Sequence, residues 1–296
     1  MLLDGWLNID KPPGMTSYGV IARLKRLTGQ RHIGHAGTLD PLATGILPVA
    51  FGQAARTIEF LHQVSKTYRA VIELGVETDT LDAEGNILFR RDASSVSHEM
   101  VNSALESFTG TIQQVPPMFS ALKRNGVPLY EIARRGETVE LKPRTVTVYN
   151  IQLLAFDPPF VTLEVDCGSG TYIRSIARDL GQVLGVGACL KSLRRTRYGV
   201  FDIKGSIELA SLETAGMVAA RLLPPGYPLA HCPAVYAGFE STERITHGVI
   251  PAEVQSQITE ARTYRLCSQD GALLAIIDAT GADLRLKVFN LTAGDT

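Results

Sequence analysis

The chain has 296 residues, of which 45% are apolar and 20% are charged, and its formal net charge is −1. This composition is ordinary for a globular protein and excludes an intrinsically disordered chain or a fibrous repeat. The length allows one large domain, or a large and a small one, each with its own core. The near-neutral charge argues against a protein that coats nucleic acid without specificity.

The lengths of the apolar runs and the spacing of the cysteines exclude membrane-spanning and zinc-binding proteins. No apolar run approaches the roughly 18 residues of a membrane helix, and Asp4 interrupts the N-terminal stretch where a secretory signal is apolar. We therefore expect a cytoplasmic protein without a membrane partner. The cysteines are far apart and form no C-x-x-C pair, which predicts buried free thiols and no zinc site. Nucleotide-binding loops and the G-x-S-x-G elbow are absent from the sequence.

The first predicted element is a helix over residues 17–28. Val20, Ile21 and Leu24 share one face, Ser17 can cap the start, and a glycine follows the last turn. Basic residues fall on the opposite face. The pattern predicts an amphipathic helix that packs on a core.

The next motif is GHAGTLDPLATG at residues 34–45. Asp40 before Pro41 is a possible helix N-cap, with the proline at the first helical position. Gly45 and Pro48 follow too soon for a helix interior, so this interpretation is poorly supported. The ring of Pro41 also restricts Asp40 to extended geometry. A positioned carboxylate in a glycine-rich loop suggests chemistry.

Strands are predicted after this loop. The stretch KTYRAVIEL at 66–74 alternates between apolar and polar residues and places Tyr68 on the apolar side. Residues 145–156 and 160–168 are rich in β-branched side chains and predict two more strands. The acidic stretch TDTLDAEG lacks the spacing of a calcium loop, so we interpret it as a polar turn between strands.

Residues 171–185 have helical spacing and begin behind a predicted Thr171 cap. Arg174 then lies in the first turn, where a cation opposes the helix dipole by about 0.3 to 1 kcal/mol. We therefore expect an anionic partner for this arginine. Asp40 is one candidate and a phosphate is another.

Proline and glycine concentrate in PPGYPLAHCP at 224–233, where we place a domain boundary. The chain then divides into a large domain at 1–233 and a small one at 234–296. Short strands separated by turns are predicted in the second part, which we expect to be an all-β module. These strands are TYRLC, ALLAIIDA and DLRLKVF.

Basic residues gather in three clusters that lie beside glycine-rich or aromatic segments. Each cluster alone is ordinary for a solvated face, but three of them make a polyanion site worth considering. The members are Arg23, Lys25, Arg26 and Arg31; Arg134, Arg135, Lys142 and Arg144; and Lys191, Arg194, Arg195 and Arg197. His35 and Asp40 lack an obvious third ligand, so we expect no metal.

The remaining candidates for chemistry are Asp40, Tyr68 and Arg174. An ionised aspartate acts as a nucleophile or a base, and an arginine at about 4 Å favours the ionised form by about 4 kcal/mol at an effective dielectric near 20. Tyr68 offers a flat face for stacking, although a core tyrosine is the more common use of such a position.

The sequence resembles the bacterial TruB-type tRNA pseudouridine synthases. The resemblance rests on GHAGTLDPLATGILPVAFGQAARTIEFL and on NIDKPPGMTS, KTYRA, TDTLDAEG, PPMFSALKRNGVPLYEIARRGETVE, PRTV, CGSGTYIRSIARDLG and LRRTRYGVF, in the order of the family. It covers most of residues 5–202, and the motifs are long and specific. The last sixty or so residues resemble the small RNA-binding module of the PUA type more loosely.

The resemblance implies roles for particular residues. Asp40 corresponds to the catalytic aspartate, Tyr68 to the tyrosine that stacks on the flipped base, and Arg174 to the arginine that pairs with the aspartate. Further residues correspond to substrate-pocket positions or to a block near the active site: His35, Tyr172, Leu193 and Lys11. A last group is implied as RNA phosphate contacts: Lys191, Arg194 and Arg195.

The resemblance also implies an α+β fold, with a mixed, largely antiparallel sheet flanked by helices and loops, followed by a PUA-like β module. The implied reaction isomerises the T-loop uridine at tRNA position 55 to pseudouridine, without cofactor or metal. The implied partner is the T arm of tRNA, and the implied state is a monomer.

Three alternatives stay open at this level. The aspartate can add covalently to the substrate or assist a glycal-like intermediate. The protein can be a noncatalytic RNA-binding protein that only holds tRNA, or a hydrolase of small molecules with an aspartyl nucleophile. Neither of the last two explains the combination of Asp40, Tyr68 and Arg174.

Overall fold

The computed structural model describes residues 2–61, 64–120, 122–124, 126–137 and 139–288. Within these residues a mixed sheet forms the centre of the larger body, in the order β14-β1-β3-β12-β4-β11-β10-β7, with β13 beside β12 and β2 beside β3. The pairs β1–β14 and β3–β12 are parallel, and the other pairs are antiparallel. The strands are β1 (Gly5–Lys11), β2 (Ile33–His35), β3 (Thr44–Phe51), β4 (Lys66–Leu74), β7 (Gly110–Gln114), β10 (Arg144–Asp157), β11 (Phe160–Cys167), β12 (Ala188–Tyr198), β13 (Phe201–Asp202) and β14 (Ile207–Glu208).

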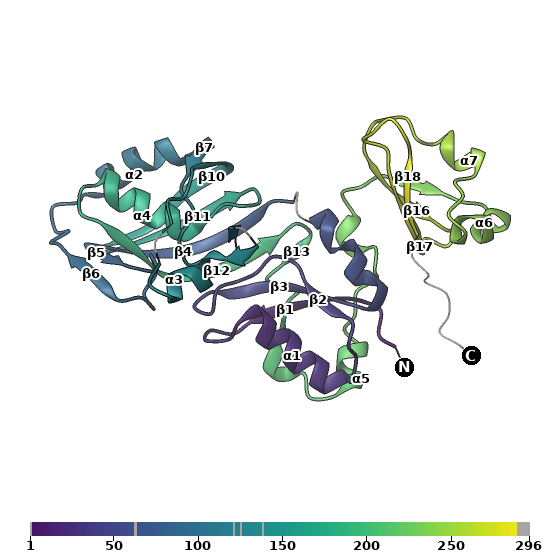
Figure 1. The fold of residues 1–296 in the computed structure, drawn as a ribbon, viewed down its shortest axis with the longest axis horizontal. Coiled ribbons are helices and arrows are strands. Elements are labelled where there is room, and N and C mark those ends of the chain that lie inside the picture. Colours follow the sequence, from purple (N-terminus) through teal and green to yellow (C-terminus); the bar gives the residue numbers. More distant parts are fainter. Residues whose placement is uncertain (1, 62–63, 121, 125, 138, 289–296) are drawn as a thin grey trace.

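Helices pack on this sheet at its two ends (Figure 1), as the predicted α+β class requires. Helices α2 and α4 lie beside β10, β11 and β4, whereas α1 and α5 lie below β1 and β3 (Figure 1). The largest apolar core is buried between the sheet and these helices. The helices of the larger body are α1 (Ser17–Thr28), η1 (Gly52–Leu61), α2 (His98–Leu105), η2 (Glu106–Phe108), α3 (Leu129–Arg134), α4 (Ile173–Val183), η3 (Leu209–Ser211) and α5 (Ala215–Ala219).

Helix α1 has the predicted bounds, but its cap differs from the prediction. Thr16 is the N-cap, and its hydroxyl accepts a hydrogen bond from the Gly19 amide at 2.9 Å. Gly29 ends the helix in the left-handed conformation, with φ of 69°. The expected Ser17 cap is wrong because the Ser17 hydroxyl bonds a distant loop instead.

Helix α4 also begins without the expected cap. It starts at Ile173 behind Tyr172, and no side chain caps it, so the prediction of a Thr171 cap is wrong. The buried amide of Gln114 holds the Tyr172 backbone in place of a cap: Oε1 accepts from the Tyr172 N–H at 2.8 Å, and Nε2 donates to its carbonyl at 3.1 Å. A residue from β7 therefore fixes the start of α4.

Strand β4 is the central element, with β11 on one side and β12 on the other. Tyr68 pairs with Val165 of β11 and with Arg195 of β12. The acidic stretch TDTLDAEG is the turn between two short strands, as predicted. The small hairpins of the body are β5 (Val76–Thr78) with β6 (Ile87–Arg90), and β8 (Lys123–Arg124) with β9 (Val127–Pro128).

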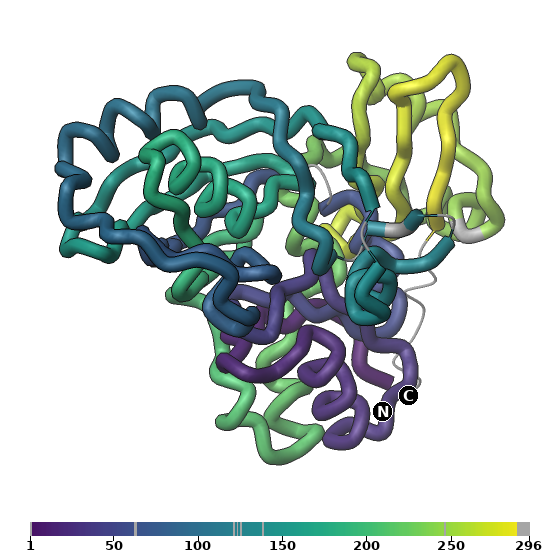
Figure 2. The backbone as a smooth tube through the Cα atoms, turned by 60° about the vertical axis from the view of Figure 1, so that its left-hand side comes forward, coloured from purple at the N-terminus to yellow at the C-terminus, as the bar shows by residue number. Residues whose placement is uncertain are grey.

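A second sheet, in the order β15-β16-β17-β18, belongs to a smaller C-terminal body that stands beside the first (Figures 1 and 2). The three predicted strands are present, and the last ends at Val288 because residues 289–296 lie outside the described residues. The body is not all-β, since it also carries short helices. Its elements and those of the connection are η4 (Tyr227–Leu229), β15 (Ala234–Tyr236), η5 (Phe239–Ser241), α6 (Thr242–Thr246), α7 (Ala252–Gln255), β16 (Thr263–Cys267), β17 (Leu273–Asp278) and β18 (Arg285–Val288).

The two bodies touch through η1. Phe60 packs against a small apolar cluster that includes Leu229 and Leu273, and Lys287 of β18 forms an ion pair with Glu59. All four cysteines are buried and free, as the sequence predicts. In the described parts of the chain, no helix has the length and apolar character needed to span a membrane.

Candidate functional site

A cavity of about 320 Å³ opens beside the central strand of the large sheet. Its walls come from the loop 37–40, the start of β4, the loop 168–172, the first turn of α4 and strand β12. A larger cavity of about 570 Å³ lies between the connection and the C-terminal body, but none of the predicted site residues lines it. Asp40, Tyr68 and Arg174 line the smaller cavity, which is therefore the candidate site.

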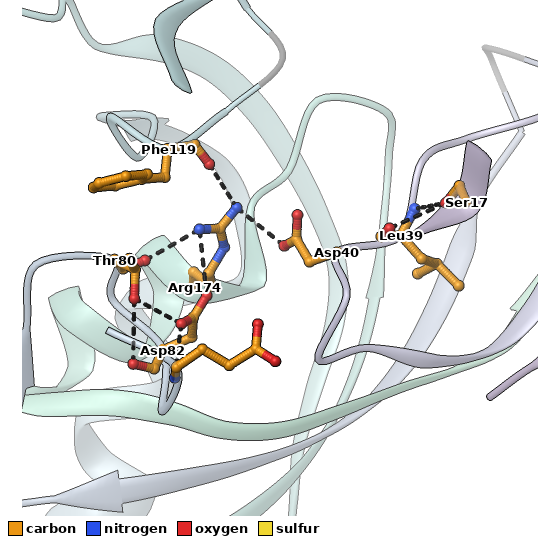
Figure 3. A network of polar contacts seen from close by, with 8 residues as sticks. Ser17, Leu39, Asp40, Thr80, Asp82, Phe119 and Arg174 are labelled. Atoms are coloured by element: carbon orange, nitrogen blue, oxygen red, sulfur yellow. Dashed lines mark hydrogen bonds and ion pairs between the residues drawn. The ribbon is translucent and has the colours of Figure 1, made fainter. Parts of the chain in front are cut away.

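The loop that carries Asp40 is fixed on both sides. Before it, the Ser17 hydroxyl accepts from the Leu39 N–H at 2.8 Å and donates to the Leu39 carbonyl at 3.0 Å (Figure 3). After it, the Pro41 carbonyl accepts from the Gly14 N–H at 2.9 Å. No helix follows Pro41 in this described segment, which excludes the N-cap interpretation of Asp40. These contacts fix the backbone on both sides of Asp40, so its carboxylate stays at the cavity.

Arg174 occupies the centre of a polar network (Figure 3). Its Nη2 lies 3.0 Å from Asp40 Oδ2, and its Nη1 lies 3.4 Å from Asp82 Oδ2. The same two nitrogens donate to the carbonyls of Phe119 at 2.8 Å and Thr80 at 3.1 Å. The predicted anionic partner of this arginine is therefore Asp40, with a second carboxylate beside it.

The second carboxylate, Asp82, was missed by the sequence interpretation, which treated its segment only as a turn. Asp82 Oδ1 accepts from the Thr80 hydroxyl at 2.6 Å and from the Glu84 N–H at 3.1 Å. Leu81 adopts φ of 63°, a strained conformation for a branched apolar residue. The available signal was an aspartate within the acidic stretch TDTLDAEG, but nothing local in the sequence connects it with Arg174.

The environment of Asp40 shifts its proton affinity. Its side chain keeps 39% of its surface exposed within the cavity, yet removal from bulk water raises the pKa of Asp40 above the ordinary value. The charge of Arg174 acts against this rise in pKa, and the charge of Asp82 adds to it. Burial and the ion pair with Arg174 therefore change the pKa of Asp40 in opposite directions, and burial has the larger effect.

Tyr68 forms a wall of the same cavity, with 8% of its surface exposed. Burial raises the pKa of the Tyr68 phenol, so the hydroxyl stays protonated at neutral pH. Tyr172 and Leu193 complete the apolar lining. The structure therefore brings together Asp40, Arg174, Tyr68, Tyr172 and Leu193.

Two predicted residues lie outside the cavity lining. His35 lies on β2, its Nδ1 is buried without a hydrogen-bond partner among the described residues, and burial lowers its pKa. Lys11 is fully buried, and its Nζ donates to the carbonyls of Pro12 at 2.9 Å, Met15 at 2.6 Å and Pro41 at 3.3 Å. Desolvation lowers the pKa of Lys11 to about 8. Lys11 thus ties the loop after β1 to the loop of Asp40.

The three expected phosphate contacts differ in their surroundings. Lys191 is half-exposed and pairs with Glu73 at 2.9 Å, and Arg194 is partly exposed and pairs with Asp10. Arg195 is only 1% exposed, and it donates to the carbonyls of Ile46 at 2.7 Å and Gly37 at 2.8 Å. Arg195 therefore lies in the lining of the cavity and not on the outer surface, and the phosphate contact expected there stays a prediction.

Lys66 is a further cavity residue that the sequence interpretation missed. It shares the side of β4 that carries Tyr68, since the two are separated by one residue. A lysine on the apolar side of an alternating strand was the available signal. Within the described residues, no three His, Cys, Asp or Glu side chains gather as metal ligands.

Comparison with known families agrees with this geometry. The family described as "TruB family pseudouridylate synthase (N terminal domain)" matches residues 25–173, and the "tRNA pseudouridylate synthase B C-terminal domain" matches residues 174–223. The second match begins at Arg174 itself. The chain therefore has the family and the fold of a pseudouridylate synthase.

Individual relatives extend the match. The tRNA pseudouridine synthase B of Dehalococcoides mccartyi is 47% identical over 293 residues, which span 97% of both chains. That of Gloeobacter violaceus is 49% identical over 240 residues, or 79% of this chain and 82% of the relative. The solved structure of a Cbf5-Nop10-Gar1 complex contains a chain with a TM-score of 0.74 and 26% identity, covering 97% of this chain and 84% of that one. The chain belongs to the TruB family.

Proposed function

We propose that this protein isomerises the T-loop uridine at position 55 of tRNA to pseudouridine, with Asp40 as the catalytic residue. The observation that carries the proposal is the Asp40–Arg174 pair at a cavity walled by Tyr68, in a chain of the TruB family. The T arm is the proposed recognition element, and the names of the relatives support tRNA as the substrate class.

The reaction rearranges bonds within one nucleotide. The bond between ribose C1′ and uracil N1 breaks, the base turns, and C1′ bonds to C5; C5 loses a proton and N1 gains one. Atoms and electrons balance without an oxidant, reductant or group donor. We therefore propose that the enzyme uses no cofactor and no metal.

The target uridine must leave its stack to reach the cavity, at a cost of a few kcal/mol. Stacking on the ring of Tyr68 returns about 1 to 3 kcal/mol of that cost. Tyr172 and Leu193 exclude water around the base, and Gln114 fixes the Tyr172 backbone. Tyr68, Tyr172 and Leu193 thus offer apolar surfaces to the base in the cavity that Asp40 lines.

Asp40 acts in its ionised form, either by adding to the substrate or by assisting a glycal-like intermediate. Burial raises the pKa of Asp40, so the carboxylate loses its charge at a higher pH than an aspartate in water does. Arg174 stabilises the carboxylate, and Asp82 with the carbonyls of Thr80 and Phe119 fixes the arginine. We assign Lys11 and Ser17 to the support of the loop and not to the chemistry.

The C-terminal body and the basic residues at the surface are proposed to bind RNA. We propose a catalytic domain at 1–233 and a PUA-like RNA-binding domain at 234–296, joined as a monomer that works in the cytoplasm on tRNA. Lys191 and Arg194 are proposed phosphate contacts at the surface, where RNA replaces their present carboxylate partners. His35 is proposed to support the strand before the loop of Asp40.

The test is tritium release from C5-labelled uridine in an unmodified tRNA transcript. We expect release with the wild-type protein, none with Asp40→Asn, and none with a transcript that has cytidine at position 55. Release that persists in Asp40→Asn would remove Asp40 from the chemistry. Tight binding of tRNA without any release would leave a noncatalytic RNA-binding protein.

A further inference from the structure

Lys66 is a buried cation in the same cavity as Asp40, and the reaction assigned above gives it no task. It is 8% exposed, and its Nζ donates to the Ser169 hydroxyl at 2.8 Å and to the Val64 carbonyl at 3.3 Å. An ammonium group has three N–H donors. These two contacts therefore leave one donor for a further acceptor.

The charge of Lys66 lacks a neutralising partner. Within the described residues, no carboxylate oxygen lies within 4.0 Å of Lys66 or Arg195. Both cations lie over the ring of Tyr198, with Lys66 Nζ at 4.6 Å and Arg195 Cζ at 5.0 Å from its centroid. The lining of the cavity thus holds two cations without a carboxylate partner among the described residues, in addition to the paired Asp40 and Arg174.

The surroundings make that charge unfavourable in the free protein. Removal from water, followed by the repulsion of Arg195, lowers the pKa of Lys66 to about 8. Buried charges in proteins are normally paired. The surface cations Lys191 and Arg194, by contrast, have carboxylate partners.

The position of Lys66 relative to Tyr68 fits a nucleotide. The two residues lie on the same side of β4, about 6.6 Å apart at the usual rise of a strand. A uridine stacked on Tyr68 with its C1′ near Asp40 carries its ribose, and the phosphates on both sides of the ribose, into or beside this cavity. An anion therefore arrives with the substrate at the place where the protein has an unpaired cation.

We propose that Lys66, oriented by Ser169, binds a backbone phosphate directly flanking the target uridine. The inference rests on the proposed function, because the phosphate belongs to the nucleotide that Asp40 isomerises. The contact holds the extruded nucleotide by its backbone while the base is free to turn. This role differs from that of Lys191 and Arg194, which face the outside of the site.

The test combines a change in the protein with a change in the RNA. Full-length tRNAs are assembled by ligation with one neutral methylphosphonate linkage, either directly 5′ or directly 3′ of the target uridine. Binding is measured in the Asp40→Asn background, so that the uridine stays intact. Lys66→Met removes the charge with similar volume, and Lys204→Met, on the exposed turn after β13, is the matched control.

With Lys66 present, we expect the neutral linkage at one of the two positions to weaken binding about 10- to 100-fold, the range of a hydrogen bond between charged groups. Lys66→Met should weaken binding of unmodified tRNA by a similar factor and reduce the salt slope by about one. In Lys66→Met the neutral linkage should add no further loss. Lys204→Met should keep the full effect of the linkage.

The inference would be overturned if, at both linkages, the neutral linkage weakened tRNA binding by Lys66→Met as much as it weakens binding by the protein with Lys66. An unchanged salt slope of binding in Lys66→Met would also overturn it. If Lys66→Met does not fold, Lys66→Arg keeps the charge and should retain the sensitivity to the same linkage; loss of that sensitivity in a folded Lys66→Arg protein also counts against the contact. Tritium release by the wild-type protein is measured in parallel. Absence of release contradicts the proposed function, whereas release together with equal losses of binding in the two proteins contradicts only the role of Lys66.

Discussion

Arg174 and Arg195 line the same cavity and are both almost fully buried, but they have different partners. Arg174 contacts the carboxylates of Asp40 and Asp82 in addition to two carbonyls. Arg195 donates to the carbonyls of Ile46 and Gly37 and forms no ion pair in the described structure. Two arginines of equal burial therefore serve two regions with different tasks.

The region around Arg195 is built for close backbone approach. Gly45 pairs with Arg195 across the parallel strands β3 and β12, with φ of 93°. A Cβ at Gly45 would lie 2.2 Å from the Arg195 carbonyl oxygen, so only glycine fits there. The comparison teaches that an arginine bound to carbonyls fixes a framework, whereas an arginine bound to carboxylates controls their charge.

The largest effect is expected for Arg174→Met. It leaves the carboxylates of Asp40 and Asp82 at the cavity without their cation, which raises the pKa of Asp40 further and lowers its ionised fraction. We expect the single-turnover rate of pseudouridine formation to fall about 1,000-fold, or ~4 kcal/mol in barrier. Rapid-quench kinetics with saturating enzyme measures it.

The matched control for this change is Arg174→Lys. A lysine keeps the charge but has no planar group to reach both carboxylates and both carbonyls at once. It should recover only part of the lost rate. A rate in Arg174→Met within tenfold of the wild type would contradict the assigned control of Asp40 by this arginine.

A smaller effect is expected for Asp82→Asn. The neutral amide has the shape of the carboxylate but cannot form the ion pair with Arg174. We therefore expect the plateau rate in a single-turnover pH profile to fall about tenfold. Asp82 is also one of the charges that raise the pKa of Asp40. Removing that charge lowers the pKa of Asp40, so Asp40 stays ionised to a lower pH.

The lower pKa of Asp40 in Asp82→Asn determines the direction in which the pH profile shifts. In the proposed reaction, activity needs ionised Asp40 and falls as the pH decreases through its pKa. The acid limb of the profile should therefore move to lower pH in Asp82→Asn, although the plateau rate is lower. An acid limb that stays in place, or moves to higher pH, would show that Asp82 has no electrostatic influence on Asp40.

The sequence allowed a good part of this site to be predicted. The helix-dipole consideration at Arg174 predicted an anionic partner, and the structure places Asp40 at 3.0 Å. It did not predict Asp82, because the contact joins residues 92 positions apart and depends on how a turn folds over α4. Distant partners of this kind leave no local pattern.

The same limit explains the errors at helix starts. Thr16 and Ser17 both offer a hydroxyl, and only the tertiary contact with Leu39 decides that Ser17 is not the cap. At α4, Gln114 from a distant strand replaces the expected cap. The burial of Arg195 was not predicted for a different reason: its basic neighbours suggested an exposed surface, but strand alternation puts it on the buried side with Leu193.

The smallest effect on the chemical step is expected for Arg195→Met, which tests the other half of the comparison. The change leaves the buried carbonyls of Ile46 and Gly37 without their donors, which costs about 2 kcal/mol or more of folding free energy. We expect the melting temperature to fall by about 4 to 8 °C and the single-turnover rate to change less than threefold. Calorimetry and rapid-quench kinetics on the same sample measure both.

Arg174→Met should show the reverse pattern, with a large loss of rate and a smaller change in melting temperature than Arg195→Met. If Arg195→Met lost as much rate as Arg174→Met while its melting temperature stayed constant, Arg195 would act on the reaction directly. Its carbonyl contacts would then be incidental to its role, and a buried arginine's partners would not indicate its task.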